Sequence, residues 1–175
     1  MRAVAGAALV AVAVALAGCG FRPMYGEGPS GGGAVPAALS QVETAIIADR
    51  TGQLVRTFLQ NGLTPRGMPG LPLYRLDVTL DEQEEEIAFR RDETATRIRL
   101  HVLADFTLVD AGTGRPLHGG RSRAVTSYNI LDDYYATIVA EEQARRVAAE
   151  QIARDIRTRL AVYFERNPGR QGRER

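Results

Sequence analysis

The stretch IRLHVLADFTL, residues 98–108, alternates apolar and polar residues almost from end to end. A period of two is the pattern of a β-strand with one buried face. The odd-numbered side chains then point to the opposite face, and the strand needs partner strands beside it and helices over its apolar side. The core-facing positions are all even-numbered: Ile98, Leu100, Val102, Ala104, Phe106 and Leu108.

Two further strands flank this one in the chain. Before it, Tyr74 to Leu80 alternates in the same way, and the charged run Glu82–Glu86 continues toward a hairpin end. After it, the turn 110–114 leads to a strand at about 117–128. The short separations predict hairpin connections between these three strands.

Two helices and one more strand complete the pattern. Residues 41–48 read as a strand that ends at Asp49, a helix-capping residue type. A helix follows with Leu54, Val55, Phe58 and Leu59 at helical spacing, and Asn61-Gly62 is a stop signal. A long helix is expected from about Asp133 to Arg166, with an apolar stripe formed by Ala149, Ile152, Ala153, Ile156, Leu160 and Tyr163.

The expected order is therefore βαβββα. Two amphipathic helices can cover the single apolar face of the sheet, which predicts an α+β fold: a two-layer sandwich with two helices packed on a four-stranded mixed sheet. The strand–helix–strand start predicts a right-handed parallel crossover. The three later strands are antiparallel neighbours.

The first residues have the features of a secretory signal. Met1-Arg2 gives a positive start, and Ala3–Ala17 is an uncharged run too short to span a membrane as a helix. The quartet Leu16-Ala17-Gly18-Cys19 has the form of a bacterial lipobox. We therefore expect a lipoprotein signal peptide at 1–18 and acylation of Cys19, the single cysteine. An ordinary secretory cleavage with a free thiol is the alternative.

The segment after Cys19 is rich in Gly and Pro, so 19–38 is expected to be the lipidated cysteine and a flexible tether. The folded domain is expected at 39–166, and 167–175 as a disordered tail. Gly20, rather than Asp, follows the cysteine; this favours an outer-membrane location on the periplasmic side.

Composition and motifs exclude several classes of function. All 22 basic residues are Arg, and 21 acidic residues balance them, so nucleic acid is not an expected partner. His101 and His118 are the only histidines, and no second cysteine exists, so we expect no metal site. His101 lies on the polar face of its strand and is expected to be solvated. No catalytic residues and no cofactor are predicted, since phosphate-loop and nucleophile-elbow motifs are missing.

Arginine is nevertheless concentrated on one predicted surface. The odd-numbered residues of the strands face away from the helices, so several arginines should share one open sheet face or the adjoining hairpin. Such a face suits phosphates or acidic partners. The alternative is an ordinary solvated face neutralised by Asp77, Asp92 and Glu93. The candidate residues for lipid or partner binding are Arg75, Arg90, Arg91, Arg97, Arg99, Arg121 and Arg123.

Four pieces of the chain together resemble one known family. They are the stretch 19–26 (CGFRPMYG), the segment Asp49-Arg50 with Gln53, Leu54 and Leu59, the tripeptide Ser127-Tyr128-Asn129, and Tyr134-Tyr135-Ala136 followed by 141–144 (EEQA). In this order they resemble the lipopolysaccharide-assembly lipoprotein family LptE, particularly its alphaproteobacterial branch.

The resemblance implies two helices on a four-stranded sheet and a non-enzymatic role. It implies a 1:1 complex with the β-barrel protein LptD, in which the lipoprotein plugs the barrel and assists its assembly. It also implies contact with lipopolysaccharide on its way to the outer leaflet. The family's basic contact residue of lysine type has no counterpart here, because the chain contains no Lys.

Two other functions remain open from the residues alone. The first is a lipid-anchored periplasmic carrier or sensor that binds an apolar ligand between helices and sheet. The second is an anchored hydrolase, which the lack of a nucleophile–base pair disfavours. A plug protein would copurify with a large barrel protein, whereas a carrier would elute alone.

Overall fold

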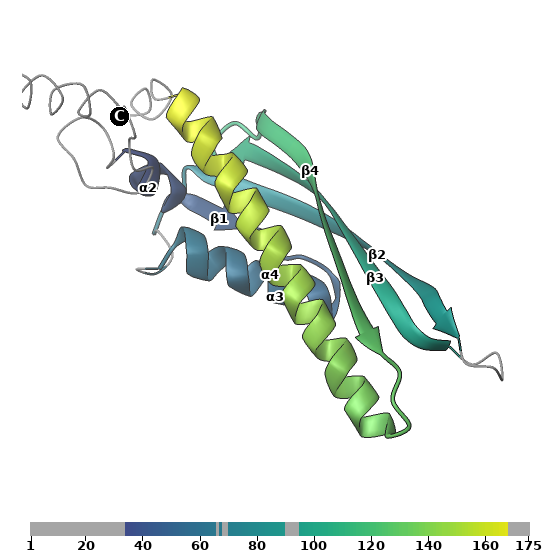
Figure 1. The fold of residues 1–175 in the computed structure, drawn as a ribbon. Coiled ribbons are helices and arrows are strands. Elements are labelled where there is room, and N and C mark those ends of the chain that lie inside the picture. Colours follow the sequence, from purple (N-terminus) through teal and green to yellow (C-terminus); the bar gives the residue numbers. More distant parts are fainter. Residues whose placement is uncertain (1–33, 66, 68–69, 90–94, 168–175) are drawn as a thin grey trace, which may run out of the picture. The chain divides into compact units, whose positions relative to one another are not determined.

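The computed structural model describes residues 34–65, 67, 70–89 and 95–167, and the elements follow the order α2, β1, α3, β2, β3, β4 and α4 (Figure 1). The predicted signal peptide, the predicted acylation site Cys19 and the predicted C-terminal tail lie outside these residues, apart from Asn167. The elements are α2 Ala34–Leu39, β1 Val42–Thr44, α3 Asp49–Leu63, β2 Tyr74–Phe89, β3 Ala95–Asp110, β4 Pro116–Asn129 and α4 Tyr134–Arg166.

The four strands form one mixed sheet in the order β1-β2-β3-β4. β1 pairs parallel to the start of β2, while β2–β3 and β3–β4 are antiparallel. The helix α3 lies in the connection between the two parallel strands, as expected for a crossover. The predicted α+β class, the mixed sheet and the two principal helices are confirmed.

Strand parity is also confirmed. The even-numbered residues Leu100, Val102, Ala104 and Leu108 are fully buried, and Phe106 is 2% exposed. The helix α4 runs alongside the long strands (Figure 1). Its buried residues recur at helical spacing and cover this side of the sheet. They are Ala144, Ala148, Ala149, Ile152, Ala153, Ile156, Leu160, Ala161 and Phe164.

Small residues let α4 approach the last strand closely. In the β3–β4 register Gly120, Ser122 and Ala124 lie opposite Phe106, Ala104 and Val102, so they share the helix-facing side. A Cβ atom on Gly120 would come within 3.1 Å of the Phe106 ring. The sequence predicts strand β4 correctly, but its pattern does not show that the helix-facing positions of β4 must be small.

The start of α3 differs from expectation. The first strand covers only Val42–Thr44 instead of 41–48, and Ile46 in the following loop is 87% exposed. Asp49 does not cap the helix: it has a positive φ of 67°, and the capping position is Ala48, whose side chain makes no cap hydrogen bond. The buried Ile47 instead packs over Gly52, where a Cβ would lie 2.7 Å from Ile47 Cγ2.

The end of α3 also differs. The helix continues through Asn61-Gly62 and ends at Leu63, which is buried. Gly62 is required for a close approach rather than for termination, because a Cβ there would lie 2.9 Å from Nη1 of Arg157 on α4. Tertiary burial of Leu63 and the contact with α4 therefore override a local stop signal.

The ends of α4 match the sequence signals. Asp133 caps the helix, and its carboxylate accepts hydrogen bonds from the backbone N–H groups of Tyr135 and Ala136. Asn167 follows the last turn and bonds to the Tyr163 carbonyl through its side chain. The short helix α2 was not expected: it occupies the last part of the segment assigned to the tether, and its Ala38 and Leu39 are buried.

The core gives the first prediction. Phe106 and Ile156 are buried on β3 and α4, so truncation of either to Ala removes packing between sheet and helix. We expect a loss of about 2 to 5 kcal/mol in the free energy of unfolding, measured by denaturant titration. Val125→Ala, on the exposed side of β4, is the control and should change it by less than about 0.5 kcal/mol. A similarly small change in Phe106→Ala would contradict the assigned layer.

Candidate functional site

The side of the sheet that faces away from α4 carries the predicted arginines. We call it the open face and define it by Arg75, Arg97, Arg99, Arg121 and Arg123. Their odd-numbered positions place them opposite the buried residues of β2 and β3, and the register brings β3 and β4 into line across the sheet. Arg90 and Arg91, like Asp92 and Glu93, lie outside the described residues.

Three of these arginines have carboxylate partners. Arg75 bonds to Asp77 at 3.0 Å, Arg121 to Asp105 at 2.9 Å, and Arg99 to Glu85 at 2.9 Å. The hydrogen bond to Asp77 raises the pKa of Arg75, and the bond to Asp105 does the same for Arg121. These pairs are exposed, so they contribute little to stability and hold much of the positive charge of the face in local pairs.

The other two arginines have neutral partners. Arg97 donates from Nη2 to the Ser127 hydroxyl at 2.8 Å. Arg123 lies 2.9 Å from Nδ1 of His101 through its Nη2. Neither has a carboxylate partner among the residues that the structure describes. Arg97 and Arg123 are therefore the cations of the open face that are most available to an external anion.

His101 connects the two kinds of arginine. Its Nε2 lies 3.3 Å from Glu85, which can only accept, and its Nδ1 faces Arg123, which can only donate. Both bonds together require a neutral ring with its hydrogen on Nε2. The hydrogen bonds from His101 and then Arg99 lower the pKa of Glu85. The expectation of a solvated His101 is wrong in this respect, since its side chain is only 20% exposed and holds both neighbours.

The neutralising carboxylates also differ from those predicted. Asp77 was expected and is found, but the structure adds Glu85 and Asp105. Both come from the cross-strand register: Glu85 is paired with Arg99, and Asp105 with Arg121. The odd numbers of all four residues agree with one face, but the pairing between strands was needed to bring each carboxylate to its arginine.

A second charged cluster lies on the helix side of the sheet and was missed. Arg145 of α4 bonds to Glu141 on its own helix and to Glu82 and Glu84 of β2. Burial alone would lower the pKa of Arg145, but the hydrogen bonds and charges of Glu141 and Glu82 raise it overall. The even numbers of Glu82 and Glu84 were the available signal, because they point these carboxylates toward α4.

The same cluster includes a tyrosine. Tyr128 is 8% exposed, and its hydroxyl donates to Glu84 at 3.4 Å. Burial, followed by the charge of Glu84, raises the pKa of Tyr128 to about 12. It packs with Ile98 and Ala144 in a small apolar cluster beside the charged one. The helix–sheet layer thus changes from apolar to ionic toward the start of α4.

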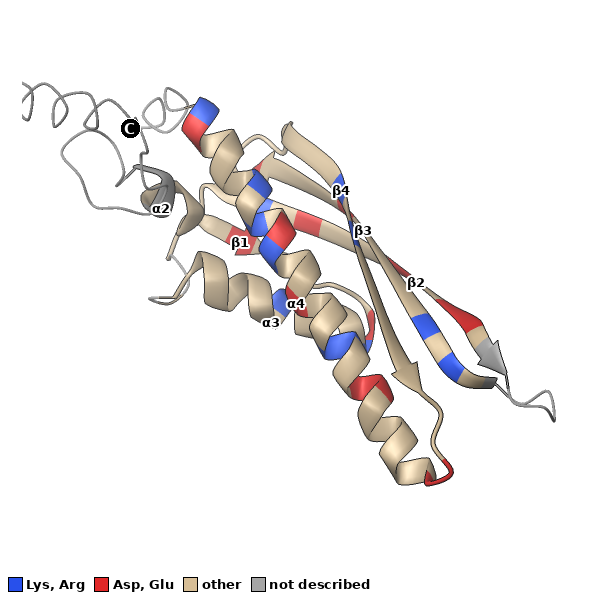
Figure 2. Cartoon of the chain, in the orientation of Figure 1, with Lys and Arg blue, Asp and Glu red and all other residues tan. Residues whose placement is uncertain are grey.

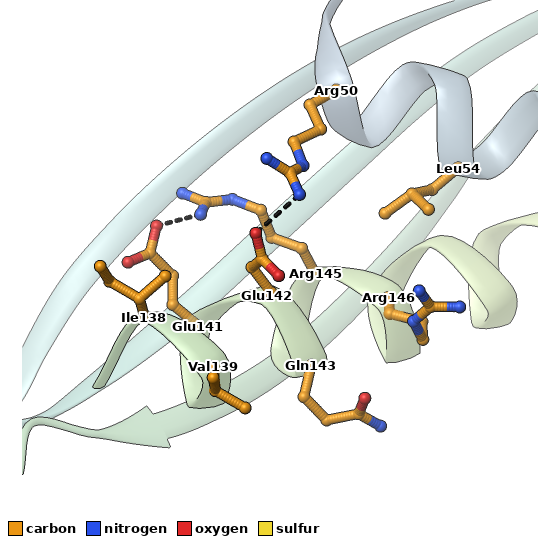
Figure 3. Close-up of a pocket in the computed structure, with 9 residues that line it drawn as sticks. All are labelled: Arg50, Leu54, Ile138, Val139, Glu141, Glu142, Gln143, Arg145 and Arg146. Atoms are coloured by element: carbon orange, nitrogen blue, oxygen red, sulfur yellow. Dashed lines mark hydrogen bonds and ion pairs between the residues drawn. The ribbon is translucent and has the colours of Figure 1, made fainter. Parts of the chain in front are cut away.

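A cavity of about 410 Å³ lies between α3 and the first half of α4 (Figure 3). Its apolar lining residues are Leu54 on α3 and Ile138 and Val139 on α4. Arg50 bridges its two helices through a 2.6 Å bond to Glu142. Charged side chains supply most of the remaining lining, so the cavity does not match the apolar site expected of a carrier. The lining is completed by Glu141, Gln143, Arg145 and Arg146.

The Arg145 cluster gives a second prediction. Arg145→Met keeps the stem of the side chain but leaves three carboxylates without their cation. We expect a loss of about 1.5 to 3 kcal/mol at neutral pH, measured by denaturant titration.

Arg154→Met is the matched control, because it removes an exposed bridge to Glu150 on the same helix. It should change stability by less than about 1 kcal/mol. Equal losses in both variants would contradict the role assigned to the cluster.

Two features are absent from the described residues. No group of three or more His, Cys, Asp or Glu side chains is arranged there to hold a metal ion. No helix in the same part of the chain combines the length and apolar character needed to cross a membrane.

Comparison with known proteins agrees with the fold. A structure described as that of a lipoprotein from Caulobacter crescentus has 31% identity and a TM-score of 0.65, and the match covers 76% of this chain and 96% of that one. A minor lipoprotein from Acinetobacter baumannii has 16% identity and a TM-score of 0.56, with 70% and 92% covered. The rare lipoprotein B of Shewanella oneidensis has 12% identity and a TM-score of 0.52, with 73% and 96% covered.

The two matches with low identity support the fold alone. No curated protein sequence matches the chain. The family model described as LptE, lipopolysaccharide-assembly, matches residues 39–160, which is most of the folded part and includes both the open face and the Arg145 cluster. The chain therefore belongs to the LptE family of lipopolysaccharide-assembly proteins.

Proposed function

We propose that this protein is the lipid-anchored outer-membrane subunit of the lipopolysaccharide translocon. In this role it plugs the LptD β-barrel in a 1:1 complex, assists assembly of the barrel and aids delivery of lipopolysaccharide to the outer leaflet. The observation that carries the proposal is the open face, where Arg97 and Arg123 have neutral partners, on a chain of the LptE family. No catalytic step is part of this function.

The anchor follows from the first residues of the chain. The lipobox Leu16-Ala17-Gly18-Cys19 supports cleavage of 1–18 and acylation of Cys19, with palmitate as one of the chains. Each buried methylene contributes about 0.8 kcal/mol, and two acyl chains are enough for stable anchoring. The folded part would then lie on the periplasmic side of the outer membrane.

The proposed place inside a barrel fits the surface chemistry. The lumen of outer-membrane barrels is polar, so a plug must present charged and hydrogen-bonding groups rather than apolar ones. The open face presents alternating ion pairs such as Arg75–Asp77 and Arg121–Asp105. On the other layer, basic and acidic segments are interleaved along α4 (Figure 2).

The lipid contact is proposed at Arg97 and Arg123. In the β3–β4 register, Arg97 of β3 lies opposite Asn129 of β4. Arg123 lies six residues before Asn129 on β4. At a rise of about 3.4 Å per residue, the backbone positions of Arg97 and Arg123 are therefore about 20 Å apart along the strands. A single phosphate cannot bridge that separation. The two cations therefore suit a large polyanion with several separated negative groups, as lipopolysaccharide is.

A carrier of apolar ligands remains the second candidate because of one observation. A cavity of about 400 Å³ lies between the start of β4 and the last turns of α4, against Val162 and Tyr163. His118 stacks on Tyr163 there, with ring centroids 5.0 Å apart. Copurification distinguishes the two functions, since the carrier would leave the membrane extract without a barrel protein.

The anchor gives a third prediction. Cys19→Ala removes the acylation site, so the protein should remain uncleaved or be mislocalised. Radiolabelled palmitate incorporation and membrane fractionation measure both effects, and Gly20→Ala serves as a control that keeps the cysteine. Equal palmitate labelling of the wild type and Cys19→Ala would contradict the assigned anchor.

The lipid contact gives a fourth prediction. Arg97→Gln with Arg123→Gln should weaken lipopolysaccharide binding at least about tenfold while the complex with the barrel protein stays intact. Charge-assisted hydrogen bonds contribute about 1.5 to 3 kcal/mol each, and about 1.4 kcal/mol corresponds to a factor of ten. Binding is measured with purified lipopolysaccharide, and association with the barrel by detergent pull-down and mass spectrometry.

The control for net charge is Arg154→Gln with Arg159→Gln, which removes two cations from α4 instead. If both double variants lose lipid binding equally, total charge and not the open face is responsible. Loss of the barrel complex alone would reassign Arg97 and Arg123 to the partner interface.

A further inference from the structure

The last strand, β4, forms one edge of the sheet. The strand order ends with β4, whose partner in the sheet is β3. It runs from Pro116 to Asn129, and its register with β3 continues without a bulge from Leu108–His118 to Arg97–Asn129. At about 3.4 Å per residue, this edge is about 44 Å long. A long regular edge is a template for pairing with another strand.

The register identifies which backbone groups point outward. The N–H of Ile130 donates to the carbonyl of Thr96 at 3.0 Å, so residues 130 and 96 are a hydrogen-bonded pair. In an antiparallel ladder such pairs recur at every second residue. The even-numbered residues of β4 therefore bond to β3. Within the regular register from His118 to Asn129, the N–H and C=O groups that point to the free edge belong to Gly119, Arg121, Arg123, Val125, Ser127 and Asn129.

These outward groups have no partners within the sheet or from side chains in the part of the chain that the structure describes. The contact of α4 with this strand instead uses a helix-facing residue, since the hydroxyl of Thr126 donates to the carbonyl of Ala144. The odd-numbered residues of β4 therefore carry both the outward backbone groups and side chains that lie on the open face. A strand added at this edge would meet both.

The charge of β4 limits what can be added. The strand contains Arg121, Arg123 and His118 but no Asp or Glu. In an antiparallel pairing of two β4 strands centred on this part, Arg121 of one copy would lie opposite Arg123 of the other, and like charges directly opposite are destabilising. Carboxylates at alternate positions would instead meet the arginines, and within the described residues the partner of Arg123 is His101 rather than a carboxylate.

We propose that β4 binds an extended acidic segment of a partner protein, which adds to the sheet as a fifth strand. Backbone hydrogen bonds to the odd-numbered residues provide the attachment. Arg121 and Arg123 select carboxylates at alternate positions of the added strand. This inference does not depend on the lipid contact proposed above, because it requires the backbone edge as well as the arginines.

The test uses the full-length chain in detergent micelles and a capped peptide of alternating Glu and Thr residues. Residue-resolved amide hydrogen exchange is recorded with the peptide at millimolar concentration. Strand addition should slow exchange selectively at the odd-numbered amides from Gly119 to Ser127, by at least tenfold. The even-numbered amides already bond to β3 and should change little. A peptide of alternating Lys and Thr should produce no protection.

Two variants separate backbone pairing from charge. Val125→Pro removes one outward donor without breaking a β3 bond, because proline is tolerated where the N–H faces solvent. It should weaken peptide binding at least tenfold, whereas Val125→Ala, which keeps the donor, should bind nearly as well as the wild type. Unchanged exchange at the even-numbered amides verifies that both variants are folded. Lipopolysaccharide binding should persist in Val125→Pro, since Arg97 and Arg123 remain.

Three results would overturn the proposal. One is no protection of any β4 amide by the acidic peptide. Another is binding without slower exchange at the odd-numbered amides, which would indicate adsorption to the open face by charge alone. The third is equal binding of the acidic and basic peptides.

Discussion

The structure depends on the burial of one side of β3. This strand lies between β2 and β4, so its period of two sets the faces of both neighbours through the register. A slip of one residue would move Leu100, Val102 and Leu108 from the core to the open face and bury Arg99 and His101. The cost of burying those polar groups fixes the register. The positions of the arginines on the open face follow from it.

The helix–sheet layer is not uniform, and this organises the charged residues. Small residues of β4 and α4, such as Ala124 and Ala148, allow close contact over the middle of the layer. Toward the start of α4, β2 presents Glu82 and Glu84 instead of apolar side chains, and Arg145 of the helix balances them. A charge that is largely removed from water needs such partners. The Arg145 cluster is thus the ionic continuation of the core.

Among the residues that the structure describes, the arginines of the open face divide into those paired with carboxylates and those that are not. Arg75, Arg99 and Arg121 belong to the first kind, while Arg97 and Arg123 bond to Ser127 and His101. The face therefore combines arginines neutralised by carboxylates, as a solvated face would have, with the two arginines proposed above to bind an external anion. The lipid proposal rests on this division, whereas the strand proposal rests on the free edge of β4 together with Arg121 and Arg123.

The sequence alone determined the strand parity, the order of the four strands and two principal helices, the α+β class and the ends of α4, because these follow from local periodicity and capping. It also placed five arginines on one face. It did not determine the length of β1, the start of α3 at Asp49 or the role of Gly62, since long-range packing decides them. Only the tertiary structure brought Glu85 to Arg99 and Arg145 to Glu82, because ion pairs between separate elements depend on register and on how helix and sheet are placed.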